Sequence, residues 1–158
     1  MLDVAEGDAL MEAMRTIRAN VAQRMSGLRM ERVLVQPMVS GLGEVLIGYR
    51  VDRDVGPLVM VAAGGVLAEI YRDRSLRLAP VDLPTAHEMI SEVRALAALA
   101  GYRGQPAGDL AALARAIVAL SRLATTDEPI LEAEINPLIV KPSGLGVVAV
   151  DALVRVMV

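Results

Sequence analysis

Four short runs of apolar and β-branched residues follow one another between positions 31 and 73, and no link between them exceeds four residues. The runs are ERVLVQPMV, EVLIGYRVD, PLVMVAA and VLAEIYRD, and a Gly64-Gly65 pair joins the last two. Parallel strands need a crossover of about a dozen residues, whereas Gly-Gly is a favoured two-residue hairpin turn. The sequence therefore predicts a mostly antiparallel β-sheet.

A helix is expected before these strands. Asp8 is the predicted N-cap, and an apolar stripe at helical spacing follows it. The stripe consists of Leu10, Met14, Ile17, Val21 and Met25.

Two further helices are expected after the strands. In TAHEMISEVRALAALAG, Thr85 and Glu88 form a predicted capping box and Gly101 ends the helix. Asp109 is the predicted cap of DLAALARAIVALSRLA. The fold class predicted from this order is α+β, an antiparallel sheet with packed helices.

Composition limits the possible functions. A chain of 158 residues is expected to form a single domain over 1–158, with a core of Ala, Val, Leu, Ile and Met because Phe and Trp are absent. The net charge of −3 gives no reason to expect nucleic acid or an anionic membrane as partner. The lack of Cys excludes disulfides and thiolate chemistry and is typical of a cytoplasmic protein.

No membrane segment or signal peptide is expected. The longest charge-free apolar run, 56–68, is too short to span a bilayer. The first ten residues have no basic region before an apolar stretch. We therefore expect a soluble, cytoplasmic protein.

The stretch EINPLIVKPSGLGVVAVD (134–151) places polar side chains inside two apolar runs joined by a turn. If the turn is centred between Ser143 and Gly144, Asn136 is opposed to Asp151, and opposed residues share a face with Cβ atoms roughly 5 Å apart. Glu134 lies two residues before Asn136 and so on that face. Three oxygen-bearing side chains suit a hard cation such as Mg²⁺, which shares its remaining positions with water and phosphates.

A purely structural explanation of these residues also stays open. Asn136 and Pro137 can simply end a strand, with Asp151 at the edge of a sheet. A shift of one residue in the pairing would move the polar side chains to opposite faces and remove the metal site.

These motifs carry a resemblance to a known family. EINPLIV with its return to VVAVDA resembles the end of an ATP-grasp domain, and VLVQPMVSGLGEVLIGYRVDRDVGPLVMVAAGG, AEIYRD, RLAP and GYRG occur in the family's order. From about Val33 onward the chain is similar to the NDP-forming acyl-CoA synthetases, such as ADP-forming acetate–CoA ligase and the succinyl-CoA synthetase β subunit. The resemblance implies an ATP-grasp C-terminal lobe with ATP or ADP and Mg²⁺ as cofactors. Asn136 and Asp151 are the implied Mg²⁺ ligands, and Glu134 is a weaker third candidate.

The resemblance also implies a nucleotide-binding role for VQPMV. The base would lie along Gln36, Pro37, Met38 and Val39, with the Pro37 carbonyl accepting from the adenine amine and the Val39 N–H donating to the ring. Proline is acceptable at 37 because only its carbonyl is used. Glu44 would reach the ribose hydroxyls. Without the resemblance, Gln36 and Glu44 are explained as polar residues on the solvent face of a hairpin.

Other residues match the family without a defined role. These are Asp73, Arg77 and Arg103, and either arginine could face an anion; a cation at Arg103, just after a helix, is also favourable for structural reasons alone. His87 is the only histidine and does not match the family's phosphohistidine motif, so a surface role is expected. No catalytic residue can be assigned in this chain.

The resemblance further implies that parts of the enzyme lie outside this sequence. In the family, lysines of an N-terminal lobe hold the phosphates, but Lys141 is the only lysine here. We therefore expect a partial ATP-grasp domain whose partners are the missing N-terminal lobe and the CoA-binding domains or subunit. A lobe that closes against a partner is expected to expose an apolar patch, and the mean hydropathy of the whole chain, +0.48, is high for a small soluble protein, so we also expect a homodimer.

Two functions remain open from the sequence. The chain is either the nucleotide- and Mg-binding part of an acyl-CoA synthetase, inactive by itself, or a non-catalytic module for assembly or nucleotide sensing. The acyl substrate and the choice between ATP and GTP are not encoded in the motifs above.

Overall fold

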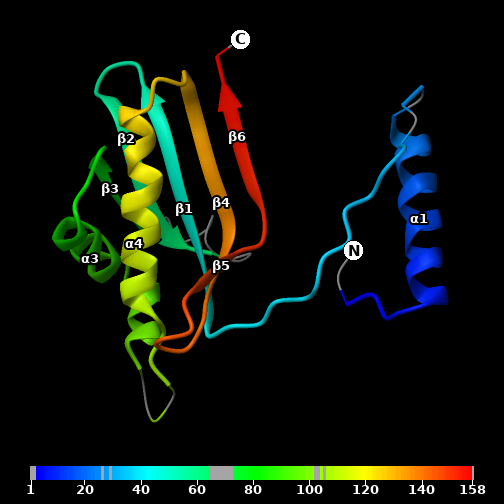
Figure 1. The fold of residues 1–158 in the computed structure, drawn as a ribbon, viewed down its shortest axis with the longest axis horizontal. Helices are drawn as coiled ribbons and strands as arrows, with labels where there is room; N and C mark the ends of the chain where they lie inside the picture. Colours follow the sequence, from blue (N-terminus) through cyan, green and yellow to red (C-terminus); the bar gives the residue numbers. More distant parts are fainter. Residues whose placement is uncertain are drawn as a thin grey trace. The chain divides into compact units, whose positions relative to one another are not determined.

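The structure is a computed structural model, and it describes residues 3–25, 27–28, 30–64, 73–101, 104 and 106–157. The chain forms two compact units, Met1–Met38 and Val39–Val158. In the first unit, α1 (Asp8–Arg24) is the long helix drawn in blue (Figure 1). Among the described residues, no helix has the length and apolar character needed to cross a bilayer.

The predicted start and end of α1 need correction. Gly7, at a φ of 69°, occupies the N-cap position, and Asp8 is already in the first turn. A carboxylate in the first turn still interacts favourably with the positive end of the helix dipole. The apolar stripe is half-buried as far as Val21, but Met25 lies beyond the helix and is 57% exposed.

The second unit is built on a six-stranded sheet in the order β3-β2-β1-β4-β5, with β6 also paired with β4. All strand pairs among the described residues of this unit are antiparallel, which confirms the predicted α+β class. β5 and β6 pair with successive halves of β4. The strands are β1 (Gly43–Asp52), β2 (Gly56–Ala63), β3 (Arg74–Leu78), β4 (Ile130–Val140), β5 (Val147–Ala149) and β6 (Ala152–Val156).

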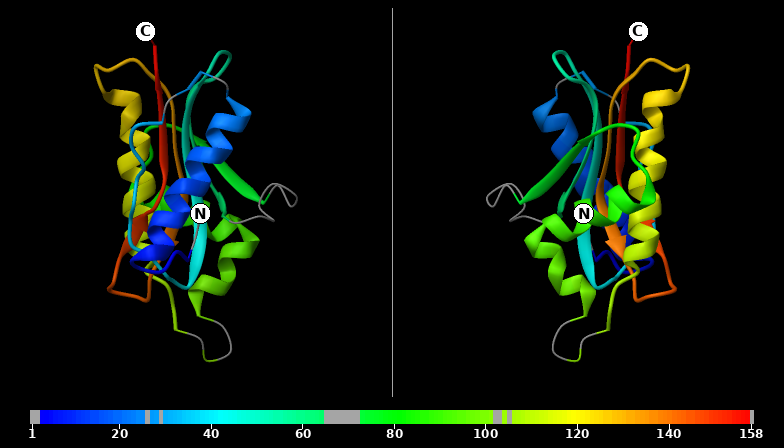
Figure 2. Two further views of the ribbon diagram at one scale, coloured as in Figure 1. Left: turned by 90° about the vertical axis from the view of Figure 1, so that its right-hand side faces the viewer. Right: turned by 90° about the vertical axis from the view of Figure 1, so that its left-hand side faces the viewer.

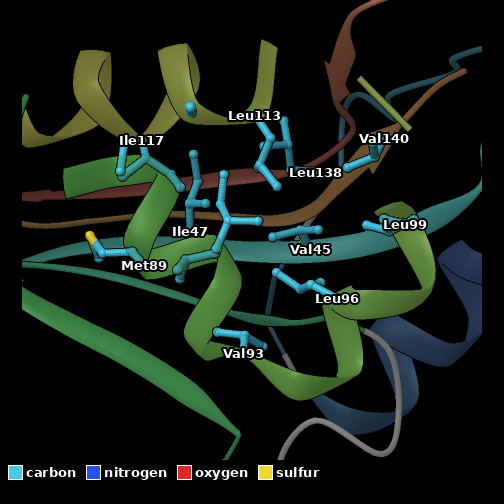
Figure 3. Packing of buried hydrophobic residues seen from close by; sticks show 14 of the residues in the cluster. Val45, Ile47, Met89, Val93, Leu96, Leu99, Leu113, Ile117, Leu138 and Val140 are labelled. Atoms are coloured by element: carbon cyan, nitrogen blue, oxygen red, sulfur yellow. The ribbon is translucent and has the colours of Figure 1, made fainter. Parts of the chain in front are cut away.

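Two helices, α3 (Leu83–Glu92) and α4 (Leu110–Ser121), lie on the same side of this sheet (Figures 1 and 2). Figure 3 shows their apolar side chains packed on β1 and β4. The buried residues along β1 alternate, because successive strand residues point to opposite faces. Val45, Ile47 and Tyr49 face the helices and are buried. We call the face that turns away from α3 and α4 the second face.

One predicted strand does not form. Residues 30–42, which include ERVLVQPMV, have no regular secondary structure, and Leu34 is 85% exposed. β-propensity produces a strand only where a hydrogen-bonded neighbour exists, and both edges of β1 are already paired with β2 and β4. The predicted strand at 66–73 lies outside the described residues except for Asp73.

The predicted helix over 85–100 is interrupted. Asp82, not Thr85, is the N-cap of α3, and its side chain accepts from the Thr85 N–H at 2.9 Å. The chain leaves the helix at Val93 and re-forms as a 3₁₀ helix over Arg94–Ala100 that ends at Gly101. Asp73 accepts from the backbone N–H groups of Arg94 and Ala95 at 3.2 and 2.7 Å, so it satisfies donors that a continuous helix would have used.

Candidate functional site

The pairing of the C-terminal hairpin places Asn136 opposite Asp151. Leu138 is opposed to Ala149 on β5, and Ile135 to Ala152 on β6, in the register predicted from the turn. Between these pairs, the Asn136 N–H donates to the Asp151 carbonyl at 3.1 Å. The predicted register is therefore confirmed.

The three predicted metal ligands come together in one pocket. Glu134, Asn136 and Asp151 line a hollow of about 220 Å³ together with Ala152 and Leu153. The Asn136 side-chain amide donates to Glu134 Oε1 at 3.3 Å. Asp151 Oδ1 accepts from the Ala152 N–H at 2.8 Å. Two carboxylate side chains and one amide side chain thus line a common space.

The chemistry of this donor set is that of a hard cation site. Carboxylate and amide oxygens are ligands for Mg²⁺ or Ca²⁺, whereas zinc sites use His or Cys. Within the ranges that the structure describes, no three His, Cys, Asp or Glu side chains form a metal cluster. A cation here would therefore need Asn136 in addition to the two carboxylates, and would keep positions for water or phosphate.

The turn of the hairpin is held by a residue whose full role the sequence did not reveal. Asp109 caps α4 as predicted, with Oδ1 accepting from the Ala112 N–H at 2.9 Å. Its Oδ2 also accepts from the N–H groups of Gly144 and Gly146, both at 3.0 Å. These bonds, led by that from Ala112, lower the pKa of Asp109. A single carboxylate thereby joins the start of α4 to the turn between β4 and β5.

Glu44 lies on the same face as the pocket. It precedes the buried Val45, so it points to the second face, as do Leu46, Gly48 and Arg50 farther along β1. Gly48 is opposed to Glu134. Glu44 and the pocket therefore occupy successive positions along the same two strands.

The predicted base-binding residues are divided between the two units. Gln36, Pro37 and Met38 end the first unit, and Val39 begins the second. All four lie in irregular backbone, and Met38 is 59% exposed. Their contacts with a nucleotide base remain a prediction.

The other family-matched residues have structural partners or lie outside the described ranges. Arg77 forms an ion pair with Glu92, which also accepts from the Ser75 hydroxyl at 2.5 Å. Arg77 in the first place, and Ser75 with it, lower the pKa of Glu92. His87 is exposed on α3. Arg103 lies outside the described residues.

A protein-family model described as an ATP-grasp domain matches residues 1–156 of this chain. The chain belongs to the ATP-grasp domain family.

Its predicted resemblance to NDP-forming acyl-CoA synthetases is confirmed by curated relatives. The ADP-forming acetate–CoA ligase I of Archaeoglobus fulgidus is 41% identical over 147 residues, which are 93% of this chain and 21% of that protein. The β subunit of acetate–CoA ligase I from Pyrococcus furiosus is 34% identical and is matched over 96% of this chain and 64% of the subunit.

Solved structures with similar folds agree with this assignment. A protein from Pyrococcus horikoshii superposes with a TM-score of 0.90 at 30% identity, covering 99% of this chain and 66% of that one. The dinucleotide forming acetyl-coenzyme A synthetase 1 of Ca. Korarchaeum cryptofilum, in complex with coenzyme A and Mg-AMPPCP, gives a TM-score of 0.82 at 32% identity over 99% of this chain and 67% of that one. This chain thus spans about a fifth of the Archaeoglobus ligase and about two thirds of the Pyrococcus β subunit.

Proposed function

We propose that this chain is the nucleotide- and magnesium-binding part of an ADP-forming acyl-CoA ligase, which couples phosphoryl transfer between ATP and ADP to formation of an acyl-CoA thioester. The observation that carries the proposal is the convergence of Glu134, Asn136 and Asp151 on one pocket in a chain related to acetate–CoA ligases. A related enzyme holds Mg-AMPPCP.

Mg²⁺ fits the donor set of the pocket. The Asn136 amide nitrogen is used by Glu134, so its carbonyl oxygen is the atom left for a cation. One oxygen of Asp151 accepts from the backbone, and the other is the candidate ligand. When bound, the cation would neutralise charge on the nucleotide phosphates.

The remaining proposed nucleotide contacts lie at the start of β1 and in the irregular segment that precedes it. Glu44 would accept hydrogen bonds from the ribose hydroxyls, and the Pro37 carbonyl and Val39 N–H would bind the base. Gln36 and Met38 would flank it. The nucleotide would then run from Glu44 toward the pocket, with its phosphates nearest Asn136 and Asp151.

Complete activity would require partners. The chain has one lysine, Lys141, close to the turn that Asp109 holds and far along β4 from the pocket. The lysines that hold the nucleotide phosphates would come from a further ATP-grasp lobe, and coenzyme A would bind to a separate domain or subunit. Self-association into a homodimer remains a prediction.

The proposal is tested by titrating the 158-residue chain with ADP in the presence and absence of Mg²⁺. We expect weak binding, on the order of 1 mM, that depends on Mg²⁺ and perturbs the backbone signals of Asn136 and Asp151 in NMR spectra. Asp151→Ala should remove the Mg²⁺ dependence, whereas Asp127→Ala, an exposed acid in the loop before β4, should keep it. Magnesium-independent binding, or a response away from the pocket, would instead support a non-catalytic module.

A further inference from the structure

A row of charged side chains crosses the second face next to the metal pocket. Arg50 on β1 is opposed to Glu132 on β4, and Glu132 is opposed to Arg155 on β6. Because opposed residues share a face, and Glu134 follows Glu132 by two residues, this row lies on the face of the pocket. We call Arg50, Glu132 and Arg155 the arginine row.

The row keeps hydrogen-bond donors for a ligand. Arg155 Nη2 contacts Glu132 Oε2 at 3.0 Å, and the Arg155 side chain remains 58% exposed. A guanidinium has five N–H donors, so this contact leaves most of them available. Arg50 is exposed as well. Two guanidinium groups with one carboxylate give the row a net positive charge.

The nearest further acid on β1 is Asp52. Its Oδ1 accepts from the N–H groups of Asp54 and Val55 at 2.9 and 3.2 Å, in the turn that follows β1. Arg50 also lowers the pKa of Asp52, although less than these two hydrogen bonds do. Asp52 is therefore held mainly by hydrogen bonds within the turn. Unlike Glu132, it does not lie between the two arginines of the row.

The role that we infer for the row follows from its position along the strands relative to the pocket and Glu44. On β1 the second face carries Glu44, Leu46, Gly48 and Arg50 in order, with about 7 Å between successive members. Gly48 is opposed to Glu134 of the pocket. The proposed ribose contact, the metal pocket and the arginine row therefore follow one another in this sequence. A nucleotide laid from Glu44 to the pocket would point its terminal phosphate toward the row.

Between Leu46 and Arg50, β1 places no side chain of its own on the second face. The intervening residue is Gly48, and a Cβ added there would come no closer than 3.7 Å to another atom, the methyl carbon of Met60. On β6, by contrast, Leu153 stands between Arg155 and Asp151. Arg50 thus has the more direct approach to a group bound beside Glu134.

We propose that the arginine row binds the phosphoryl group that is exchanged with the nucleotide, on the side of the metal pocket opposite the ribose. This inference rests on the proposed function, because the row is placed relative to a nucleotide bound at Asn136 and Asp151. The ligand is a phosphoryl dianion, which guanidinium groups bind through charge-assisted hydrogen bonds. Its source is either a small molecule such as an acyl phosphate or a phosphorylated side chain of a protein segment.

The simplest competing explanation is an ion pair that only joins β6 to β4. An exposed pair of this kind contributes little to stability and has no need of Arg50. If the row is a ligand site, both arginines should contribute to phosphate affinity and neither should contribute much to the stability of the fold. The comparison of Arg50 and Arg155 therefore separates the two explanations.

The experiment titrates inorganic phosphate into the 158-residue chain with Mg²⁺ present and follows backbone and arginine side-chain signals by NMR. Arg50→Gln and Arg155→Gln are each expected to weaken phosphate binding by about tenfold. Arg53→Gln is the matched control, because Arg53 is an exposed arginine in the turn after β1. It should leave phosphate affinity unchanged. Thermal unfolding of each variant checks the fold.

Three outcomes are distinguishable. Loss of phosphate binding in both row variants, with Mg-ADP binding retained, supports the inference. Unchanged phosphate binding in both variants, or an equal loss in Arg53→Gln, overturns it even if Mg-ADP still perturbs Asn136 and Asp151. Failure of Mg-ADP to bind the unaltered chain overturns the proposed function and the phosphoryl site with it.

A second arm distinguishes the source of the phosphoryl group. Acetyl phosphate and a phosphoserine peptide are compared in the same titration. Tighter binding of acetyl phosphate supports a small-molecule donor or acceptor, and tighter binding of the peptide supports a phosphorylated protein segment. Binding of neither probe at the row overturns the proposal.

Discussion

Asn136 and Asp151 are joined through their backbones as well as facing the same pocket: the Asn136 N–H donates to the Asp151 carbonyl at 3.1 Å. This bond lies where the neighbour of β4 changes from β5 to β6. The strand pairing therefore holds the two side chains close together without a metal. The pocket is preorganised by the sheet, and its side chains can be replaced with little effect on the register.

From this arrangement we predict that Asn136→Ala and Asp151→Ala weaken Mg²⁺-nucleotide binding but leave the fold intact. In the complete enzyme, either change should reduce acyl-CoA formation by orders of magnitude, because a shared cation loses a ligand and its phosphate contacts. The measurement is the Mg²⁺ dependence of turnover in each variant. An unchanged Mg²⁺ requirement in both would show that the cation binds elsewhere.

Asp109 gives a prediction about pH. Its hydrogen bonds to backbone N–H groups, first among them that of Ala112, hold its pKa below the ordinary value. A carboxyl with a lower pKa in the folded state stabilises the fold above the unfolded value of about 3.9 and loses that contribution as pH falls through the folded value. Asp109→Asn should therefore lower the melting temperature at pH 7, and the difference from the unaltered chain should shrink below about pH 4.

Thermal unfolding between pH 7 and pH 3 measures this difference. Asp127→Asn is the control, because Asp127 is exposed in the loop before β4. Its melting temperature should follow that of the unaltered chain at every pH. A constant difference for Asp109→Asn across the range would mean that the loss is one of packing and not of the charged hydrogen bonds.

The sequence predicted the antiparallel sheet and the convergence of Glu134, Asn136 and Asp151 because both depend on local rules. Short glycine links forced antiparallel pairing, and the turn at Ser143 and Gly144 set a register that brought Asn136 opposite Asp151. The same kind of rule identified Asp109 as a cap. The carboxylate's second set of bonds, to Gly144 and Gly146, joins segments more than 30 residues apart, and no spacing pattern encodes it.

The errors arose where another group competed with the predicted signal. Thr85 and Glu88 match a capping box, but Asp82 three residues earlier provides the cap. The helix was expected to continue past Val93, yet Asp73 binds the N–H groups at the start of a new turn. The residues around Leu34 have strand propensity, but they pair with no strand among the described residues and remain irregular. The Asp82 cap is a local contact, but the contacts of Asp73 and the pairing around Leu34 depend on tertiary structure, which a single sequence does not display.

The core gives a prediction about stability. Ile117 of α4 is fully buried among the side chains that α3 and β1 contribute (Figure 3). Ile117→Ala should destabilise the fold by about 2–5 kcal/mol, because it removes apolar contacts and leaves a cavity. Urea unfolding measures the change. Leu145→Ala, at a residue 66% exposed, should stay within about 0.5 kcal/mol of the unaltered chain.

The last prediction concerns Gly64, which lies against the backbone of the proposed ribose-binding residue. The Gly64 N–H donates to the Glu44 carbonyl at 2.7 Å. A Cβ at position 64 would lie 2.7 Å from the Glu44 carbonyl carbon and 2.9 Å from the Val45 nitrogen. These are backbone atoms that cannot rotate away, so Gly64→Ala should cost about 1–3 kcal/mol and displace Glu44.

Gly48→Ala is the control, because its Cβ would meet no atom closer than 3.7 Å, and a glycine within a strand is itself slightly unfavourable. Urea unfolding should therefore show a loss of stability only for Gly64→Ala, with a shift of the Glu44 amide signal in NMR spectra. Equal stability of the two variants would show that the start of β1 yields to the extra methyl group, and Glu44 would then not be held in place by Gly64.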